Sequence, residues 1–136
     1  MREYLKHYID GQWVEPSGGR EQDVVNPATN QPIGRLGLAS RDDLDRAIPA
    51  AERGFRHWRG VSAFERGKIL RKAAELVRAR ADDIARVLTR EQGKVIAEAR
   101  LELLSAADII DWFSGEGQRA YGRVIPARAD GVRNMV

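Results

Sequence analysis

The stretch Glu91-Gln92-Gly93-Lys94 separates two helical patterns, and the longer of them follows it from Val95 to about Tyr121. In that longer pattern, apolar or small residues recur in steps of three and four, which places them on one side of an α-helix. These residues are Ile96, Ala99, Leu103, Ala106, Ile110, Phe113, Gly117 and Ala120. Gly93 stands where the first pattern ends, as expected of a left-handed C-terminal cap. The sequence therefore predicts two helices joined by a tight turn at Gly93.

Two earlier helices are predicted from their N-terminal signals. Ser40 is followed three residues later by Asp43, and Ser62 is followed in the same way by Glu65. Both pairs are capping-box arrangements, the first with the shorter acid. A break near Arg80, after which acidic residues suit a new helix N-terminus, would divide the second of these patterns. The long helix must pack against other elements, and we expect the earlier part of the chain to supply them.

Short strands are predicted before the helices. Tyr8-Ile9 and Trp13-Val14 flank Asp10-Gly11, a dipeptide that favours the type I′ turn of a β-hairpin. Asp23-Val24-Val25 is a short strand candidate that ends at a turn, and residues 33–39 return as a second strand.

The predicted elements divide the chain into three regions. Residues 1–39 form a β-hairpin region, residues 40–121 form a helical region, and residues 122–136 form an extended arm. The predicted fold class is therefore mainly α, with small β-hairpins at the N-terminus and an extended C-terminal arm. At 136 residues the chain is long enough to bury a real core.

Composition narrows the classes of function. The 23 basic residues outnumber the 20 acidic ones only slightly, and the two kinds are interleaved along the helices, which is typical of solvated helix faces. The absence of cysteine excludes a thiol nucleophile and a thiolate metal site within this sequence. No stretch approaches the ~20 apolar residues of a membrane span. We therefore expect a cytoplasmic setting, with no nucleic-acid or membrane partner and no metal.

One motif imitates a cofactor site. The run from Gly115 to Ala120 matches the G-x-G-x-x-A letters of a dinucleotide fingerprint. That fingerprint needs a strand before it and a helix that opens at it, whereas this run lies deep within a helical pattern. We interpret it as small residues that allow close helix packing. No residue of the sequence is assigned a catalytic, cofactor-binding or metal-binding role.

Several short motifs in a fixed order carry a resemblance to a known family. They are Tyr8-Ile9-Asp10-Gly11-Gln12-Trp13-Val14, Val25-Asn26-Pro27-Ala28-Thr29, Trp58, Glu91-Gln92-Gly93-Lys94 and Ala97-Glu98-Ala99. In this order and spacing the sequence resembles the start of NAD(P)-dependent aldehyde dehydrogenases. The later runs look most like the succinate-semialdehyde dehydrogenase branch, namely Asp111-Trp112-Phe113-Ser114 and Ala120-Tyr121-Gly122-Arg123-Val124-Ile125-Pro126.

The resemblance implies the N-terminal part of the α/β aldehyde dehydrogenase fold. In that family the opening part wraps the cofactor-binding domain, so residues 40–121 are expected to pack on that domain. The nucleophilic Cys, the general-base Glu, the oxyanion-hole Asn and the cofactor loop all come later in family members. We therefore expect this chain not to be catalytic alone. NAD or NADP is the cofactor implied for the full-length family, and none is expected for this chain by itself.

The resemblance also suggests two functional surfaces. One face of the long helix borders the aldehyde entrance in the family, which makes Leu101, Leu104 and Ser105 candidate entrance residues; ordinary helix packing is the alternative. The last region matches the start of the β-arm through which subunits assemble. Its candidate residues are Val124, Ile125, Val132 and Val136. The implied partners are the remainder of an aldehyde dehydrogenase chain or other subunits, in a homo-oligomer.

Two other classes of function stay open at this point. The chain could be a truncated, stand-alone interaction module that pairs with other chains through its terminal strand. It could also be a basic helical nucleic-acid binder, although a net charge of +3 spread over interleaved residues offers few simultaneous phosphate contacts.

Overall fold

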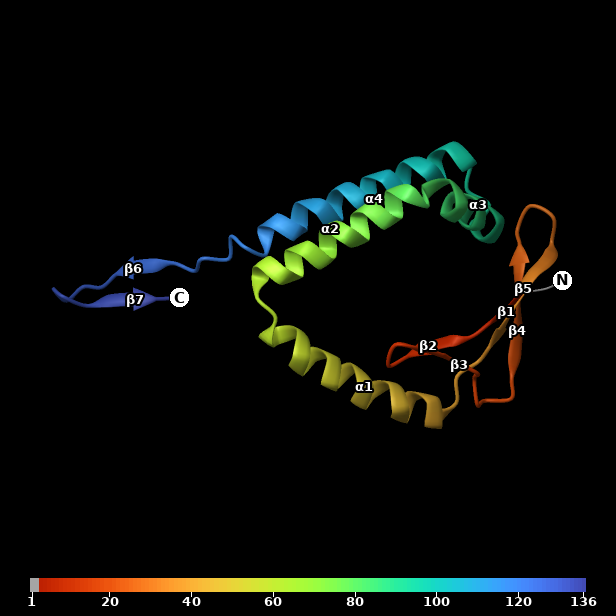
Figure 1. The fold of residues 1–136 in the computed structure, drawn as a ribbon, viewed down its shortest axis with the longest axis horizontal. Helices are drawn as coiled ribbons and strands as arrows, with labels where there is room; N and C mark the ends of the chain where they lie inside the picture. Colours follow the sequence, from red (N-terminus) through yellow and green to blue (C-terminus); the bar gives the residue numbers. More distant parts are fainter. Residues whose placement is uncertain (1–2) are drawn as a thin grey trace.

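The computed structural model describes residues 3–136, so the first two residues of the predicted 1–39 region lie outside it. The helices are α1 (Arg41–Gly60), α2 (Ala63–Ala79), α3 (Ala81–Gln92) and α4 (Ile96–Glu116). The strands are β1 (Glu3–Leu5), β2 (His7–Ile9), β3 (Gln12–Val14), β4 (Glu21–Asn26), β5 (Gln31–Gly37), β6 (Val124–Pro126) and β7 (Arg133–Met135). The predicted class is confirmed: the chain is mostly helical, with small hairpins at both ends (Figure 1).

The predicted N-terminal hairpin is present. Strands β2 and β3 are antiparallel, and Tyr8 is paired with Trp13. Asp10 and Gly11 connect them with φ angles of 53° and 78°, the left-handed values that a type I′ turn requires. The rings of Tyr8 and Trp13 lie 5.0 Å apart between centroids, a cross-strand aromatic contact that stabilises the pair.

A three-stranded sheet with the order β1-β5-β4 contains a pairing that the sequence did not predict. Strands β4 and β5 form the expected antiparallel pair. Strand β1, however, runs parallel to β5, with Leu5 opposite Leu36. A parallel partner requires a crossover connection, and here the chain between β1 and β5 contains the β2–β3 hairpin, the following loop and β4. A three-residue strand has no alternation pattern of its own, so only tertiary packing selects it.

The predicted helix boundaries are confirmed at the capping residues. The Ser40 hydroxyl accepts a hydrogen bond from the Asp43 backbone N–H, and the Asp43 side chain accepts one from the Ser40 N–H, which completes the capping box. Ser62 accepts from the Glu65 N–H at 3.2 Å, so this cap has the serine half of the arrangement. The break at Arg80 separates α2 from α3.

The prediction that the long helix extends to Tyr121 was wrong. Helix α4 ends at Glu116, and Gly117 is its C-terminal cap. The following backbone bonds are short-range: Gln118 N–H donates to the Gly115 carbonyl at 3.1 Å, and Arg119 N–H donates to the Glu116 carbonyl at 2.9 Å. Glycines at 115 and 117 lower the helix propensity of this last turn, which explains the early end.

Small side chains form the core of the helical layer. Within residues 5–136, every buried apolar side chain is an alanine: Ala50, Ala74, Ala81, Ala85, Ala99 and Ala107. Helix α4 packs mainly on α2 and α3. The predicted stripe of α4 is therefore buried only in part, because Phe113, one of its large members, stays 60% exposed.

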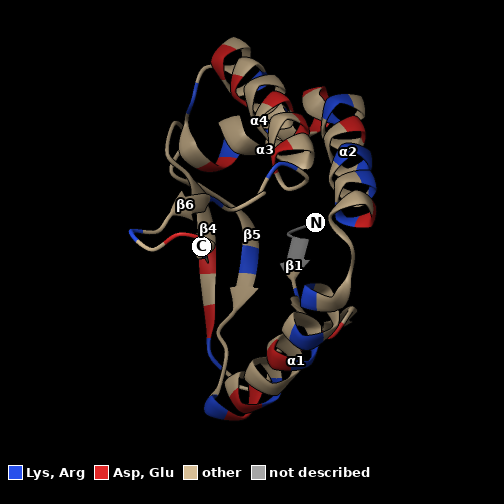
Figure 2. Cartoon of the chain, turned by 90° about the vertical axis from the view of Figure 1, so that its left-hand side faces the viewer, with Lys and Arg blue, Asp and Glu red and all other residues tan. Residues whose placement is uncertain are grey.

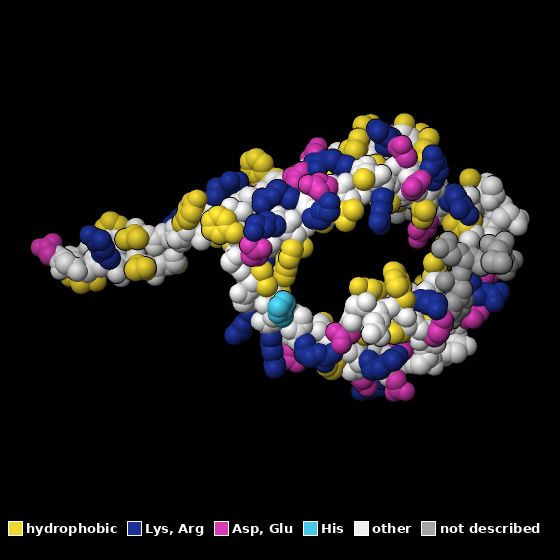
Figure 3. All heavy atoms as spheres, viewed as in Figure 1, with side chains coloured by type: hydrophobic (Ala, Val, Ile, Leu, Met, Phe, Trp, Pro, Cys, Tyr) yellow, Lys and Arg dark blue, Asp and Glu magenta, His cyan; other side chains and the backbone are white. Residues whose placement is uncertain are grey.

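The chain is arranged around an open space. In the space-filling view, the layer of α2 and α4 lies on one side of this space, α1 and the β2–β3 hairpin lie on the other, and the three-stranded sheet closes one end (Figure 3). Apolar side chains line parts of the rim. The β6–β7 hairpin projects away from the opposite end (Figure 1). This shape leaves the inner faces of the elements without a covering layer from within the described chain.

Candidate functional site

Two of the sequence motifs meet at the turn between α3 and α4. Gly93 has a φ angle of 75°, and a Cβ at this position would lie 3.0 Å from Cγ of Pro27. The turn therefore needs glycine both for its backbone conformation and for the approach of Pro27. This contact places the end of β4 against the start of α4. The structural role predicted for Gly93 is confirmed.

Lys94 is held by α4 and is not available for chemistry. Its Nζ donates a hydrogen bond to the Glu102 carboxylate, and this hydrogen bond raises the pKa of Lys94. A raised pKa keeps the ammonium charged at neutral pH, whereas a lysine base or nucleophile needs a lowered pKa. Arg100 Nε also donates to Asp82 Oδ1 at 2.7 Å, which ties α4 to α3. The Glu91–Lys94 stretch is therefore a structural junction.

The structure brings two of the three candidate entrance residues together. Leu101, which is 62% exposed, and Ser105, also exposed, lie one turn apart on an uncovered face of α4. Leu104 is half-buried and lies on the flank of the helix. Trp112, at 65% exposure, continues the line of Leu101 and Ser105 two turns further along. Its seven-residue spacing from Ser105 is the sequence signal that could have added it to the set.

The predicted arm, residues 122–136, folds back on itself as a β-hairpin. Strands β6 and β7 are antiparallel, with Val124 paired to Met135 and Ile125 to Asn134. Val136 extends the pairing, since its N–H donates to the Arg123 carbonyl at 2.9 Å. The extended arm predicted from the sequence is thus present, and its two strands pair with each other. The four candidate arm residues, Val124, Ile125, Val132 and Val136, are all exposed.

The dinucleotide-like letters from Gly115 to Ala120 have no cradle for a cofactor. Gly115 lies inside α4 and Gly117 caps its end, so a helix precedes this motif where the fingerprint requires a strand. The residues at this position do not fit a nicotinamide dinucleotide. The interpretation of these glycines as helix-packing residues was wrong: the nearest atoms to a Cβ at Gly115 belong to Arg119, the nearest at Gly117 to Phe113, and Gly117 and Ala120 are exposed.

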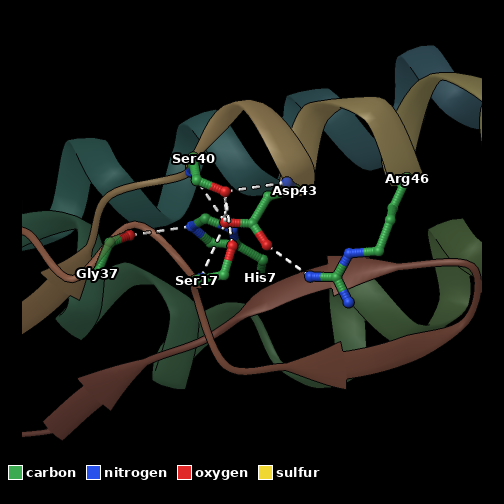
Figure 4. A network of polar contacts seen from close by, with 6 residues as sticks. All are labelled: His7, Ser17, Gly37, Ser40, Asp43 and Arg46. Atoms are coloured by element: carbon green, nitrogen blue, oxygen red, sulfur yellow. Dashed lines mark hydrogen bonds and ion pairs between the residues drawn. The ribbon is translucent and has the colours of Figure 1, made fainter.

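The most buried polar group is Asp43, at the junction of the hairpin region and α1 (Figure 4). It is 1% exposed, and its Oδ2 accepts hydrogen bonds from the backbone N–H groups of Ser17 and Ser40, both at 2.9 Å. Arg46 donates to Oδ1 at 2.5 Å. The Ser40 and Ser17 backbone donors hold the pKa of Asp43 far below its usual range. Asp43 thus anchors the loop before β4 to the first turn of α1, and this group serves the fold.

Asp43→Asn should lower the midpoint of thermal unfolding by about 5 °C or more at pH 7. An amide carries no charge for the Arg46 guanidinium and is a weaker acceptor for the two backbone donors. The pKa of Asp43 is lower in the folded chain than in the unfolded chain, where it is about 3.9. The Asp43 carboxylate therefore contributes fully to the free energy of unfolding above that pH, and this contribution is lost as the pH falls below it. Calorimetry from pH 7 to pH 3 should show the difference in thermal midpoint between the original chain and Asp43→Asn becoming smaller. The exposed Asp42→Asn variant is the control, and an equal effect there would contradict the anchor role.

Charge, metal and membrane features add no further site. Basic and acidic residues are interleaved along the helices (Figure 2), as the sequence predicted. Within the described residues, no group of three or more His, Asp or Glu side chains is placed to hold a metal ion. None of the described helices combines the length and apolar character that crossing a bilayer requires.

Comparison with known proteins identifies a family and several relatives with similar sequence and structure. The sequence matches the aldehyde dehydrogenase family over residues 13–136. It is 46% identical over 130 residues to 4-(hydroxymethyl)benzenesulfonate dehydrogenase TsaD1 of Comamonas testosteroni, covering 94% of this chain and 27% of that protein. It is 41% identical over 128 residues to the NADP(+) succinate-semialdehyde dehydrogenase GabD of Escherichia coli strain K12, with 94% and 27% covered. The solved lactaldehyde dehydrogenase from Escherichia coli superimposes with a TM-score of 0.91 at 35% identity, over 99% of this chain and 28% of that one.

The helices and small sheets are those of the N-terminal part of an α/β oxidoreductase fold. The chain belongs to the aldehyde dehydrogenase family. It spans about 27% of the length of the curated relatives named above. The resemblance drawn from the motif order is therefore confirmed at the level of the family.

Proposed function

We propose that this chain is the N-terminal portion of an NAD(P)-dependent aldehyde dehydrogenase that oxidises a small aldehyde of the succinate-semialdehyde type to the acid. The family match over residues 13–136 carries this proposal. The likeness to GabD supports the semialdehyde as substrate. A cytoplasmic setting, favoured by a sequence without cysteine, belongs to the same proposal.

In this proposal the open space is where the cofactor-binding part of the enzyme packs. The inner rim carries apolar side chains that need a cover, and the core of alanines shows how little large apolar surface the chain buries alone. Residues 40–121 then form a layer over the cofactor domain. The catalytic groups come from that other part, since this sequence has no cysteine and its lysine at 94 is ion-paired.

The isolated chain should therefore show no aldehyde-dependent reduction of NAD+ or NADP+. The measurement is the nicotinamide absorbance at saturating succinate semialdehyde. The positive control is a chimera that joins this chain to the part of GabD beyond the 128 matched residues, in which turnover should appear. Turnover by the isolated, exhaustively purified chain, or a folded chimera without activity, would contradict the proposal.

We further propose that Leu101, Leu104 and Ser105 border the aldehyde entrance. Support comes from the exposed position of Leu101 and Ser105 on one line of α4. In the chimera, Leu101→Trp should raise the KM for the semialdehyde about tenfold with a smaller change in kcat, because bulk at an entrance weakens binding before chemistry. Ile69→Trp, at an exposed position on α2, is the matched control. An unchanged KM in Leu101→Trp would remove this face from the entrance.

The β6–β7 hairpin is proposed as the start of the arm through which subunits form a homo-oligomer. Its support is the exposure of Val124, Ile125, Val132 and Val136 on a hairpin that projects from the body. The same exposure also favours the second candidate function, a stand-alone interaction module. The chimera separates the two, because a module would not restore dehydrogenase activity.

A further inference from the structure

The end of α1, the start of α2 and the end of α4 come together at one end of the helical layer (Figure 1). A groove is lined by residues of these three segments. Its volume is about 380 Å³. Trp58, Leu70 and Phe113 provide apolar walls, and Arg66 provides the one charged side chain among the lining residues that the structure describes. The groove is thus mostly apolar with a single cationic group.

Arg66 differs from the other cationic side chains of the chain. Between residues 5 and 136, only Arg66 and Lys94 are half-buried among lysines and arginines, and the rest are exposed. Lys94 has its partner in Glu102. The Arg66 guanidinium makes no hydrogen bond or ion pair with any residue in the described part of the chain. Its guanidinium carries five N–H donors and no acceptor among the described residues, so it is free to bind a carboxylate from outside them.

The nearby carboxylates are already engaged. Glu65, next to Arg66 in the chain, accepts a hydrogen bond from Lys68 at 2.6 Å. Glu116, near the groove at the end of α4, is paired with Arg119. The partner of Arg66 must therefore come from outside these elements.

We propose that this groove binds a polypeptide segment that presents an Asp or Glu carboxylate to Arg66 and aliphatic neighbours to Trp58, Leu70 and Phe113. The planar guanidinium fork matches a carboxylate through two parallel hydrogen bonds. The apolar walls fit flanking side chains and would shield that ion pair from water. A free carboxylate ion would leave those walls uncovered. This inference rests on the proposed function, in that the segment belongs to the remainder of the dehydrogenase polypeptide.

The test uses this chain and two capped peptides that differ only in charge. Binding of acetyl-Leu-Glu-Leu-amide and acetyl-Leu-Gln-Leu-amide is followed by tryptophan fluorescence at low protein concentration, with acetate as a third ligand. The Glu peptide should bind about tenfold more tightly than the Gln peptide. Arg66→Gln should abolish that difference. Lys68→Gln, which removes an exposed cation already paired with Glu65, should retain it.

Three results would overturn the inference: equal binding of both peptides, a difference that persists in Arg66→Gln, or acetate binding as tightly as the Glu peptide. A separate readout excludes a merely structural role. Arg66→Met keeps the apolar stem and removes an unpaired charge, so it should raise the thermal midpoint of the isolated chain while it abolishes the peptide preference. A lower midpoint would mean that Arg66 serves the fold. None of these results depends on dehydrogenase turnover, so failure here and failure of the proposed function are distinguishable.

Discussion

Replacing Gly67 by valine is expected to cost this chain about 3 kcal/mol or more of stability. Gly67 is buried in α2 at the crossing with α4. A Cβ at this position would lie 2.7 Å from the Ser114 carbonyl oxygen and 2.8 Å from Nε2 of Gln118. The first of these atoms is backbone, which cannot move unless α4 moves with it. The two helices would have to separate.

That separation would affect the main packing contact of the helical layer. Helix α4 packs on both α2 and α3, and Ala74 of α2 and Ala99 and Ala107 of α4 are fully buried. Arg78 strengthens the same contact with ion pairs to Asp108 at 2.8 Å and to Asp111 at 2.6 Å. Pushing the helices apart would weaken dispersion contacts along this whole line.

The control is Gly54→Ala in the middle of α1, where a Cβ would have no atom within 4 Å. Alanine there should stabilise the chain by about 0.5–1 kcal/mol, because glycine is a poor helix former. Gly67→Ala gains the same helix propensity, but its Cβ would collide with the Ser114 carbonyl oxygen. This substitution should therefore destabilise the chain. Urea denaturation of Gly67→Val, Gly67→Ala and Gly54→Ala gives the change in the free energy of unfolding for each variant. A stabilising Gly67→Ala would show that the helices can shift apart without loss.

The sequence was informative wherever one residue type satisfies a local backbone requirement. Asp10-Gly11 predicted the hairpin turn, Ser40 predicted the start of α1, and Gly93 predicted the end of α3, because each requirement is met within a few residues. The close approach at Gly67 could not be predicted, since it depends on which turn of α4 lies opposite. The parallel position of β1 depends likewise on long-range packing.

The candidate site was predicted less completely for a related reason. Helical spacing alone places Leu101 and Ser105 on one face, but it does not say which side of α4 meets α2. The apolar residues of α4 lie on more than one side of it, since Ile109 and Phe113 are exposed while Ala99 and Ala107 are buried. A helix that is apolar on several sides packs on several partners, and a periodicity argument for one stripe cannot separate them.

The isolated chain should self-associate as its concentration rises. Large apolar side chains are exposed on every helix: Phe55 on α1, Phe64 on α2, Val87 on α3 and Trp112 on α4. Each Å² of apolar surface removed from water contributes about 25 cal/mol, and the alanine core leaves most of the large apolar side chains uncovered. Association itself costs several kcal/mol, so we expect a net affinity in about the micromolar range.

Sedimentation velocity across a concentration series should show the average mass increasing. Trp112→Lys should weaken the association, because it removes apolar area and adds charge on the exposed line of α4 that Leu101, Ser105 and Trp112 share. Ser105→Lys adds the same charge on the same line without removing apolar area, so it should weaken association less if apolar burial is the driving force. A monomer at every concentration with a sharp cooperative thermal transition would show that these elements are stable without cover. In that case the open space would need no partner, and the packing of a cofactor domain there would lose its main structural support.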